Sequence, residues 1–220
     1  VVTRVAAEHP ELVRSLALLS PALPDLRPRW PAWELLLTLL PLIGPRLVAD
    51  ALRGDPERTA RQVFATCYGY PAAVTGERWT AELEAIGRRA GLPHGSQAYR
   101  GSLRSLVAAY LHGGQRRLWR QAAQVGVRTL LIYGGRDQLV DWRQAERAEA
   151  TFRDARTVLM LDAGHVAHLE LPTRVAALLR GFYGEPRSLP LDPGMLARRG
   201  TVEGSAGAAV AVAPAARRPP

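Results

Sequence analysis

The sequence predicts an α/β fold, in which helices cover a parallel sheet. Three short apolar runs, at residues 12–20, 127–133 and 156–161, have the length and composition of strands buried on both faces. Helices are predicted at residues 142–152 and from Pro172 onward, because apolar residues recur there at helical spacing. Strands that alternate with helices in this way are typical of parallel sheets.

The chain divides into four predicted segments. Residues 1–21 form a helix and a strand of the core, and residues 22–122 form an insertion of helices separated by Pro and Gly. Residues 123–184 return to the strand and helix pattern of the core. Residues 185–220 are rich in Pro, Gly, Ala and Arg without a sustained period, so we expect a disordered tail there.

The helices of the insertion follow from two local signals. Asp55 and Pro56 mark a helix start, as the capping residue and the first helical residue. Apolar stripes at helical spacing then indicate three helices. The stripes are Ala60, Val63, Phe64 and Cys67; Trp79, Leu83, Ile86 and Ala90; and Leu103, Leu106, Val107 and Tyr110.

The composition excludes several classes of protein. With 220 residues, 47% of them hydrophobic and 22% charged, the chain can bury one sizeable core, which argues against wholesale disorder. Its one cysteine, Cys67, excludes a disulfide framework and a multi-cysteine zinc site. The net charge is +9, but all 29 basic residues are arginines spread along the chain, so we expect no nucleic-acid partner.

Two polar residues follow two of the predicted strands. Asp137 comes shortly after the run 127–133, and His165 comes shortly after the run 156–161. Because the carboxyl ends of parallel strands meet at one edge of a sheet, we expect the two side chains to lie close together. A carboxylate beside an imidazole accepts one ring N–H, fixes the tautomer and stabilises the imidazolium, so the other ring nitrogen can act as a general base. The alternative is that Asp137 caps a helix and His165 is a loop residue bonded to backbone.

The residues around this pair resemble a known family. Residues 134–140 read G-G-R-D-x-x-V and residues 164–172 read G-H-x-x-H-x-E-x-P, which together resemble the C-terminal signature of the α/β-hydrolase superfamily. The opening, with H-P-E-L-V at residues 9–13, is similar to the helix and strand that follow that family's nucleophile turn. The resemblance implies a partial α/β-hydrolase parallel sheet, about three C-terminal strands, with residues 22–122 as a helical cap.

The resemblance also assigns roles to individual residues. Asp137 matches the acid of a catalytic triad, and His165 matches the general base. We expect His168 to be a packed neighbour of the site and Glu170 to act at a helix start. The positions that match supporting residues of the family are His168, Glu170, Gly134 and Gly164.

The sequence departs from the family at the nucleophile. The family carries it in a G-x-S-x-G turn, and no such pattern occurs in these 220 residues. We therefore expect a fragment that is inactive on esters by itself, and poorly soluble because the strand at residues 12–20 would form an open edge. Whether the missing nucleophile is Ser or Asp stays open. We expect a cytoplasmic protein. Because the sequence opens at Val1 inside a predicted element, it does not decide whether a signal peptide precedes these residues.

The expected activity is hydrolysis of an ester or related bond in a small apolar substrate. Trp30, Trp33 and Leu36 would contribute an apolar surface over the site, although such residues equally suit the cap's own core. No phosphate-binding glycine loop and no metal-ligand cluster is apparent, so we expect no cofactor and no metal. The alternatives are a non-catalytic binding module and a membrane-surface protein that retains the cap. The oligomeric state stays open.

Overall fold

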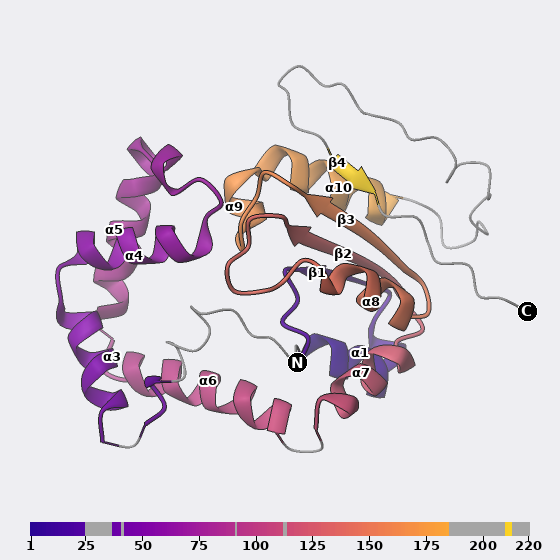
Figure 1. Ribbon diagram of the computed structural model, residues 1–220, viewed down its shortest axis with the longest axis horizontal. Coiled ribbons are helices and arrows are strands. Elements are labelled where there is room, and N and C mark those ends of the chain that lie inside the picture. The colour runs from indigo at the N-terminus through magenta and orange to yellow at the C-terminus, as the bar shows by residue number, and fades with distance from the viewer. Residues whose placement is uncertain (25–36, 41, 91, 112–113, 185–209, 213–220) are drawn as a thin grey trace, which may run out of the picture.

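The structure, a computed structural model, describes residues 1–24, 37–40, 42–90, 92–111, 114–184 and 210–212. Within these residues a four-stranded sheet forms the centre of the fold, with strands in the order β1-β2-β3-β4 (Figure 1). The strands are β1 (Ser15–Leu19), β2 (Arg128–Gly134), β3 (Ala155–Met160) and β4 (Val210–Val212).

The first three strands run parallel, as the sequence predicts. Leu19 pairs with Ile132 across β1 and β2, and Gly134 pairs with Met160 across β2 and β3. The first strand is shorter than the predicted run 12–20, because the residues before it form a 3-10 turn that starts at Pro10. The prediction of a partial parallel sheet in an α/β fold is confirmed.

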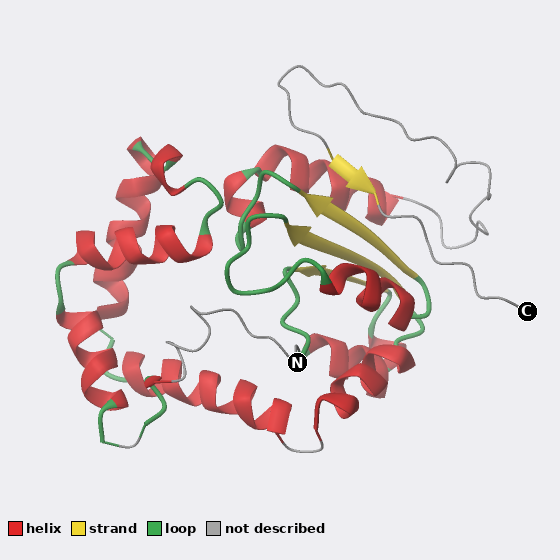
Figure 2. Ribbon diagram, in the orientation of Figure 1, coloured by secondary structure: helices red, strands yellow, loops and turns green. Residues whose placement is uncertain are grey.

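Helices cover both faces of the sheet (Figures 1 and 2). On one face lie α1 (Val2–Glu8), α7 (Gly114–Gln124) and α8 (Gln144–Thr151), and on the other lie α9 (Ala167–Glu170) and α10 (Pro172–Gly184). In β2, Leu131 and Tyr133 pack toward α1 and α8, whereas Leu130 and Ile132 pack toward α9 and α10. A strand buried on both sides needs apolar residues at every position, which explains its uninterrupted apolar run.

The insertion forms a group of helices beside the sheet (Figure 2). Its helices are α3 (Gly44–Arg53), α4 (Pro56–Cys67), α5 (Gly76–Ala90) and α6 (Gly95–Leu111). The carboxylate of Asp55 accepts the backbone N–H of Glu57 at 3.0 Å and so caps α4, as predicted. Phe64 packs with Trp79, so α4 and α5 share a small core of their own.

One helix within residues 22–122 packs with the sheet. Helix α7 contributes Trp119 and Ala122 to the core cluster that contains Ala6 of α1 and Leu131 of β2. The indole N–H of Trp119 donates to the backbone carbonyl of Pro24 at 3.1 Å, which satisfies the polar atom of a buried ring.

Several expectations fall on residues outside the described ranges. Trp30, Trp33 and Leu36 lie there, as does most of the expected tail at residues 185–220. The described part of that tail differs from a disordered segment, because β4 pairs antiparallel with β3. Its Val-Ala-Val sequence suits a strand, and the edge of β3 offers backbone donors and acceptors to pair with.

The insertion meets the sheet at a close contact between two backbones. A Cβ atom added to Gly164, in the loop after β3, would lie 2.6 Å from the carbonyl oxygen of Cys67 and would also collide with the backbone nitrogen of Gly69. A Cβ atom at Gly134 would lie 2.6 Å from the carbonyl oxygen of Ala163. Glycine is therefore required at both positions because no side chain fits between the approaching backbones.

This contact predicts that Gly164→Ala is destabilising. The added methyl group has to push the loop away from Cys67 and Gly69, so we expect the free energy of unfolding to fall by about 1–3 kcal/mol. The control is Gly181→Ala in α10, where none of the described atoms lies within 4 Å of the added Cβ. That substitution should raise stability by about 0.5–1 kcal/mol through helix propensity. Urea unfolding of the two variants measures the difference, and equal effects would contradict the prediction.

Candidate active site

Asp137 and His165 meet at the carboxyl ends of β2 and β3. The Nδ1 atom of His165 lies 2.9 Å from Oδ2 of Asp137, although the two residues are 28 positions apart in the chain. Because an ionised carboxylate only accepts hydrogen bonds, Nδ1 carries the proton and donates it, which leaves Nε2 as the acceptor of the ring. The side chain of Asp137 is 1% exposed and that of His165 is 29% exposed. The imidazole therefore stands between a buried anion and the solvent side of the site.

The second oxygen of Asp137 holds its own loop. Oδ1 accepts the backbone N–H of Leu139 at 2.8 Å and the backbone N–H of Val140 at 2.9 Å. Asp137 therefore stabilises a turn with one oxygen and binds His165 with the other. Of the two interpretations left open by the sequence, the structure supports the partner of the histidine: Asp137 holds a turn and does not cap a helix, since α8 begins at Gln144.

Asp137 is more acidic than an ordinary aspartic acid. Burial favours its neutral form, but the hydrogen bond from His165, the charge of His165 and the N–H groups of Val140 and Leu139 outweigh burial and lower its pKa. The carboxylate is consequently ionised throughout the neutral range. A buried anion in contact with the imidazole stabilises the imidazolium that forms when the ring accepts a proton.

The structure places two of the four supporting residues differently from the expectation. Glu170 does not act at a helix start: its carboxylate accepts the N–H of Gly164 at 2.6 Å and the N–H of Gly69 at 2.7 Å. His168 is exposed, because the short helix α9 turns Ala167 toward the core and the following residue away from it. Gly134 and Gly164 provide the close backbone contacts described above.

The C-terminal end of α4 lies against both loops of the site, a contact that the sequence did not indicate. The backbone N–H of His165 donates to the carbonyl of Cys67 at 2.8 Å, and the side chain of Gln138 donates to the carbonyl of Ala65 at 2.9 Å. Burial, followed by the charges of Asp137, Glu82 and Glu170, raises the pKa of the Cys67 thiol. The acceptors of both bonds are main-chain carbonyl groups, which every residue carries, so the sequence carries no signal for these contacts.

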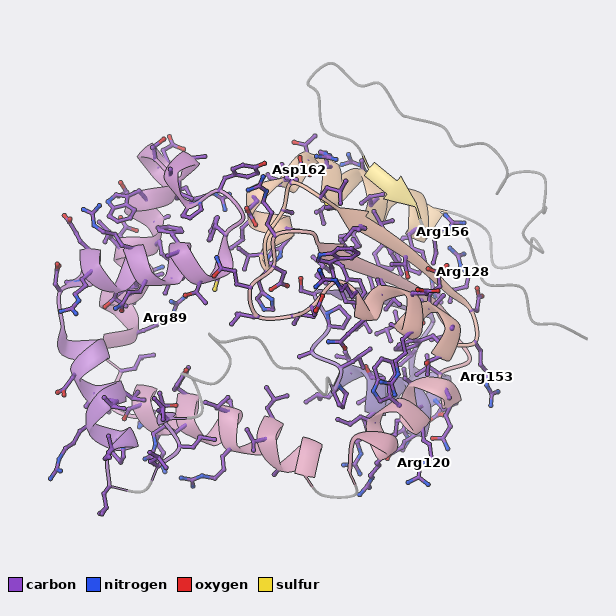
Figure 3. The ribbon with its side chains drawn as sticks, in the orientation of Figure 1. Arg89, Arg120, Arg128, Arg153, Arg156 and Asp162 are labelled. Atoms are coloured by element: carbon purple, nitrogen blue, oxygen red, sulfur yellow. The ribbon has the colours of Figure 1, made fainter. Side chains whose placement is uncertain are left out.

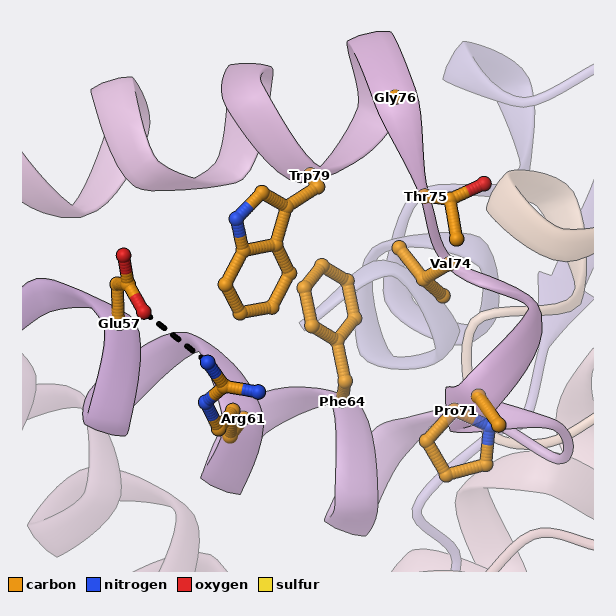
Figure 4. A pocket seen from close by; sticks show the side chains of 9 residues that line it. Glu57, Arg61, Phe64, Pro71, Val74, Thr75, Gly76 and Trp79 are labelled. Carbon is orange, nitrogen blue, oxygen red and sulfur yellow. Dashed lines mark hydrogen bonds and ion pairs between the residues drawn. The ribbon is translucent and has the colours of Figure 1, made fainter.

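Two cavities adjoin this region. One, of about 620 Å³, lies between α4 and α5 (Figure 4), where the rings of Phe64 and Trp79 lie 5.5 Å apart and Arg61 pairs with Glu57 at 3.0 Å. The other, of about 330 Å³, lies between the cap and α9. Neither cavity is lined by the Asp–His pair. Trp79, which the sequence placed on an apolar helical stripe, packs against Phe64 inside the insertion.

Charge is dispersed over the molecule. In Figure 3, Arg89 lies on the insertion, far from Arg120 and Arg153 on the opposite side of the molecule. Arg174 forms an ion pair with Asp162 at 2.6 Å. Among the described residues, no group of three His, Cys, Asp or Glu side chains is arranged to hold a metal ion, and no helix is long and apolar enough to cross a membrane.

Solved structures of several hydrolases resemble this fold. A membrane phospholipase A, described as a bacterial virulence factor, is 21% identical, with a TM-score of 0.58 over 83% of this chain and 52% of its own. The 2-hydroxy-6-oxo-6-phenylhexa-2,4-dienoate hydrolase of Rhodococcus sp. strain RHA1 is 16% identical, with a TM-score of 0.61 over 84% of this chain and 60% of its own. A serine hydrolase of Cycloclasticus zankles is 12% identical, with a TM-score of 0.60 over 83% and 59%.

These likenesses show the fold, and a family model identifies it. The chain spans less than two thirds of the length of each of these three structures. No curated protein matches the chain. The model of the alpha/beta hydrolase fold matches residues 1–172, which include both loops of the site and everything between them and α1. The chain therefore belongs to the alpha/beta hydrolase fold family.

Proposed function

We propose that the chain is the acid-and-base portion of a hydrolase that cleaves an ester or related bond in a small apolar substrate. The observation that carries this proposal is the 2.9 Å hydrogen bond between Asp137 and His165 at the ends of adjacent parallel strands. It is supported by the family, since a buried acid that orients a histidine is how such a site prepares a general base. The similar structures include a phospholipase A and a 2-hydroxy-6-oxo-6-phenylhexa-2,4-dienoate hydrolase.

In the proposed mechanism His165 moves a proton twice. With Nδ1 bonded to Asp137, Nε2 takes the proton of the attacking group as that group forms a bond to the substrate. The imidazolium is stabilised by the ionised Asp137 and then gives the proton to the leaving group. Asp137 itself stays ionised throughout, in keeping with its lowered pKa.

The nucleophile is proposed to be a Ser or an Asp, and these 220 residues contain no G-x-S-x-G turn. A Ser would give its own proton to Nε2, whereas an ionised Asp would attack directly and Nε2 would take a proton from the water that cleaves the ester intermediate. Without it the histidine has no group to activate, so we propose that the 220-residue chain alone does not turn over esters. A place in the cytoplasm, and an apolar contact with substrate by Trp30, Trp33 and Leu36, remain parts of the proposal.

One observation favours a second candidate, attachment to a membrane surface. Large apolar side chains are exposed along a short stretch of the cap, and exposed apolar groups of this kind bind the boundary between lipid headgroups and acyl chains. They are Leu37, Leu40, Leu42, Ile43 and Leu47.

The roles proposed for Asp137 and His165 predict a loss of activity on substitution. In the protein encoded by the complete reading frame that contains these residues, His165→Ala and Asp137→Asn should each lower kcat for a short-chain nitrophenyl ester by at least about 10³-fold, through loss of the base and of its correct tautomer. The control is His9→Ala, whose side chain is 58% exposed beside Glu11 and should leave kcat unchanged. Near-normal turnover by either site variant would refute its assigned role, and His165-dependent turnover by the 220-residue chain alone would refute the proposed inactivity.

The lowered pKa of Asp137 predicts how stability depends on pH. Because the pKa of Asp137 is lower in the folded protein than in the unfolded chain, its ionised form stabilises the fold above the unfolded pKa of about 3.9. This stabilisation is lost as the pH falls from that value through the folded pKa. Asp137→Asn should therefore flatten the decline of the unfolding free energy below about pH 4, whereas Asp50→Asn at an exposed position should not. Urea unfolding at a series of pH values measures both slopes, and identical slopes would be the contrary result.

Binding to lipid vesicles separates the hydrolase from the membrane-surface candidate. If the chain acts on a soluble substrate, it should not co-sediment with anionic lipid vesicles at physiological salt. Co-sedimentation that Leu42→Asp abolishes and Leu12→Asp preserves would favour the membrane candidate, because these side chains are comparably exposed, at 82% and 73%, and only Leu42 belongs to the apolar stretch.

A further inference from the structure

We propose that Glu170 is a positioning residue that couples the docking of the cap to the pose of the His165 ring. Its two carboxylate oxygens accept hydrogen bonds from two segments far apart in the sequence. Oε1 accepts from the N–H of Gly164 at 2.6 Å, and Oε2 accepts from the N–H of Gly69 at 2.7 Å. The first donor directly precedes the histidine and the second belongs to the cap. The inference rests on the role proposed for His165 as the general base.

The same part of the insertion also binds the backbone of His165. The N–H of His165 donates to the carbonyl of Cys67 at 2.8 Å, so the consecutive N–H groups of Gly164 and His165 are both fixed. Glu170 binds Gly69, two residues after Cys67, and thereby holds the acceptor of His165 as well. The three hydrogen bonds connect Glu170, the loop that carries His165 and residues 67–70 of the insertion, which we call the cap segment.

The loop that carries the acid touches the same cap segment. The backbone N–H of Arg136, the residue before Asp137, donates to the carbonyl of Ala163 at 2.9 Å. The guanidinium carbon of Arg136 lies 4.1 Å from the centre of the Tyr70 ring, at a distance typical of a cation–π contact. Displacement of the cap segment would therefore disturb the backbone on both sides of the bond between Asp137 and His165.

A carboxylate is the group that this position requires. It accepts two hydrogen bonds through two equivalent oxygens, and bonds from N–H groups to a charged acceptor are stronger than those to a neutral one. In Glu170→Gln one oxygen becomes an NH₂ group that faces an N–H donor, and in Glu170→Ala both backbone N–H groups lose their acceptor. Loss of an acceptor at half-buried donors frees the loop to leave the conformation that aims the ring at Asp137.

The test compares local opening with the state of the imidazole, in the protein from the complete reading frame labelled with ¹⁵N in the histidine rings and backbone. Hydrogen exchange reports the N–H groups of Gly69 and Gly164, and the proton resonance of His165 Nδ1–H reports its bond to Asp137. In Glu170→Ala we expect both amides to exchange at least about tenfold faster and the Nδ1–H resonance to be lost to exchange with water. The matched control is Glu57→Ala, a half-exposed cap carboxylate paired with Arg61, which should change neither signal.

Each outcome decides the proposal. Faster exchange at Gly69 and Gly164 with an unchanged Nδ1–H resonance would reduce Glu170 to a structural clamp and overturn its positioning role. Unchanged exchange at both amides would overturn the bridge itself. Should Glu170→Ala unfold, as the exchange of the Leu131 amide in β2 would reveal, Glu170→Gln serves instead: faster exchange at one of the two amides with a weakened Nδ1–H resonance supports coupling, and no change overturns it. Absence of the Nδ1–H resonance in the unsubstituted protein would refute the Asp137–His165 pair and with it the proposed function. This outcome is distinct from a failure of the role of Glu170 alone, in which the unsubstituted protein shows the resonance.

Discussion

The parallel pairing of β2 with β3 is the constraint on which the site depends. Their register ends with Gly134 opposite Met160, so the loops that follow leave the sheet side by side. The backbone then continues the pairing beyond the strands, since the N–H of Gly135 donates to the carbonyl of Met160 at 2.8 Å. Two side chains that are 28 positions apart thereby start from neighbouring backbone positions. A shift of the register by one residue would reverse the faces of the strand and separate the pair.

The helical insertion stabilises this arrangement through main-chain carbonyl groups. Carbonyl groups at the end of a helix lack partners within that helix, and α4 offers those of Ala65 and Cys67 to donors from the two loops of the site. The bond from the N–H of His165 to Cys67 needs close approach of the two backbones, which the glycine at position 164 permits. The helix end and the loops therefore satisfy one another's polar groups.

The sequence predicted the elements better than the contacts between them. The apolar runs of β2 and β3 follow from burial on both faces, and the positions of Asp137 and His165 follow from the strand ends. The bridge by Glu170 could not be predicted, because its donors are backbone N–H groups that any residue carries. The same holds for Trp79, whose apolar character suits a substrate surface and a cap core equally and whose place is decided by tertiary packing.

Asp137 illustrates how one carboxylate can hold a turn and orient a histidine at the same time. A buried carboxylate is costly unless its lone pairs are satisfied, and the two N–H groups of the turn satisfy one oxygen while the imidazole satisfies the other. The two N–H groups of the turn fix the Asp137 side chain by themselves, so the orientation of its second oxygen does not depend on His165. An acceptor aimed in advance binds the imidazolium without reorganisation at the moment the proton is transferred, which is the condition under which a buried charge assists catalysis most.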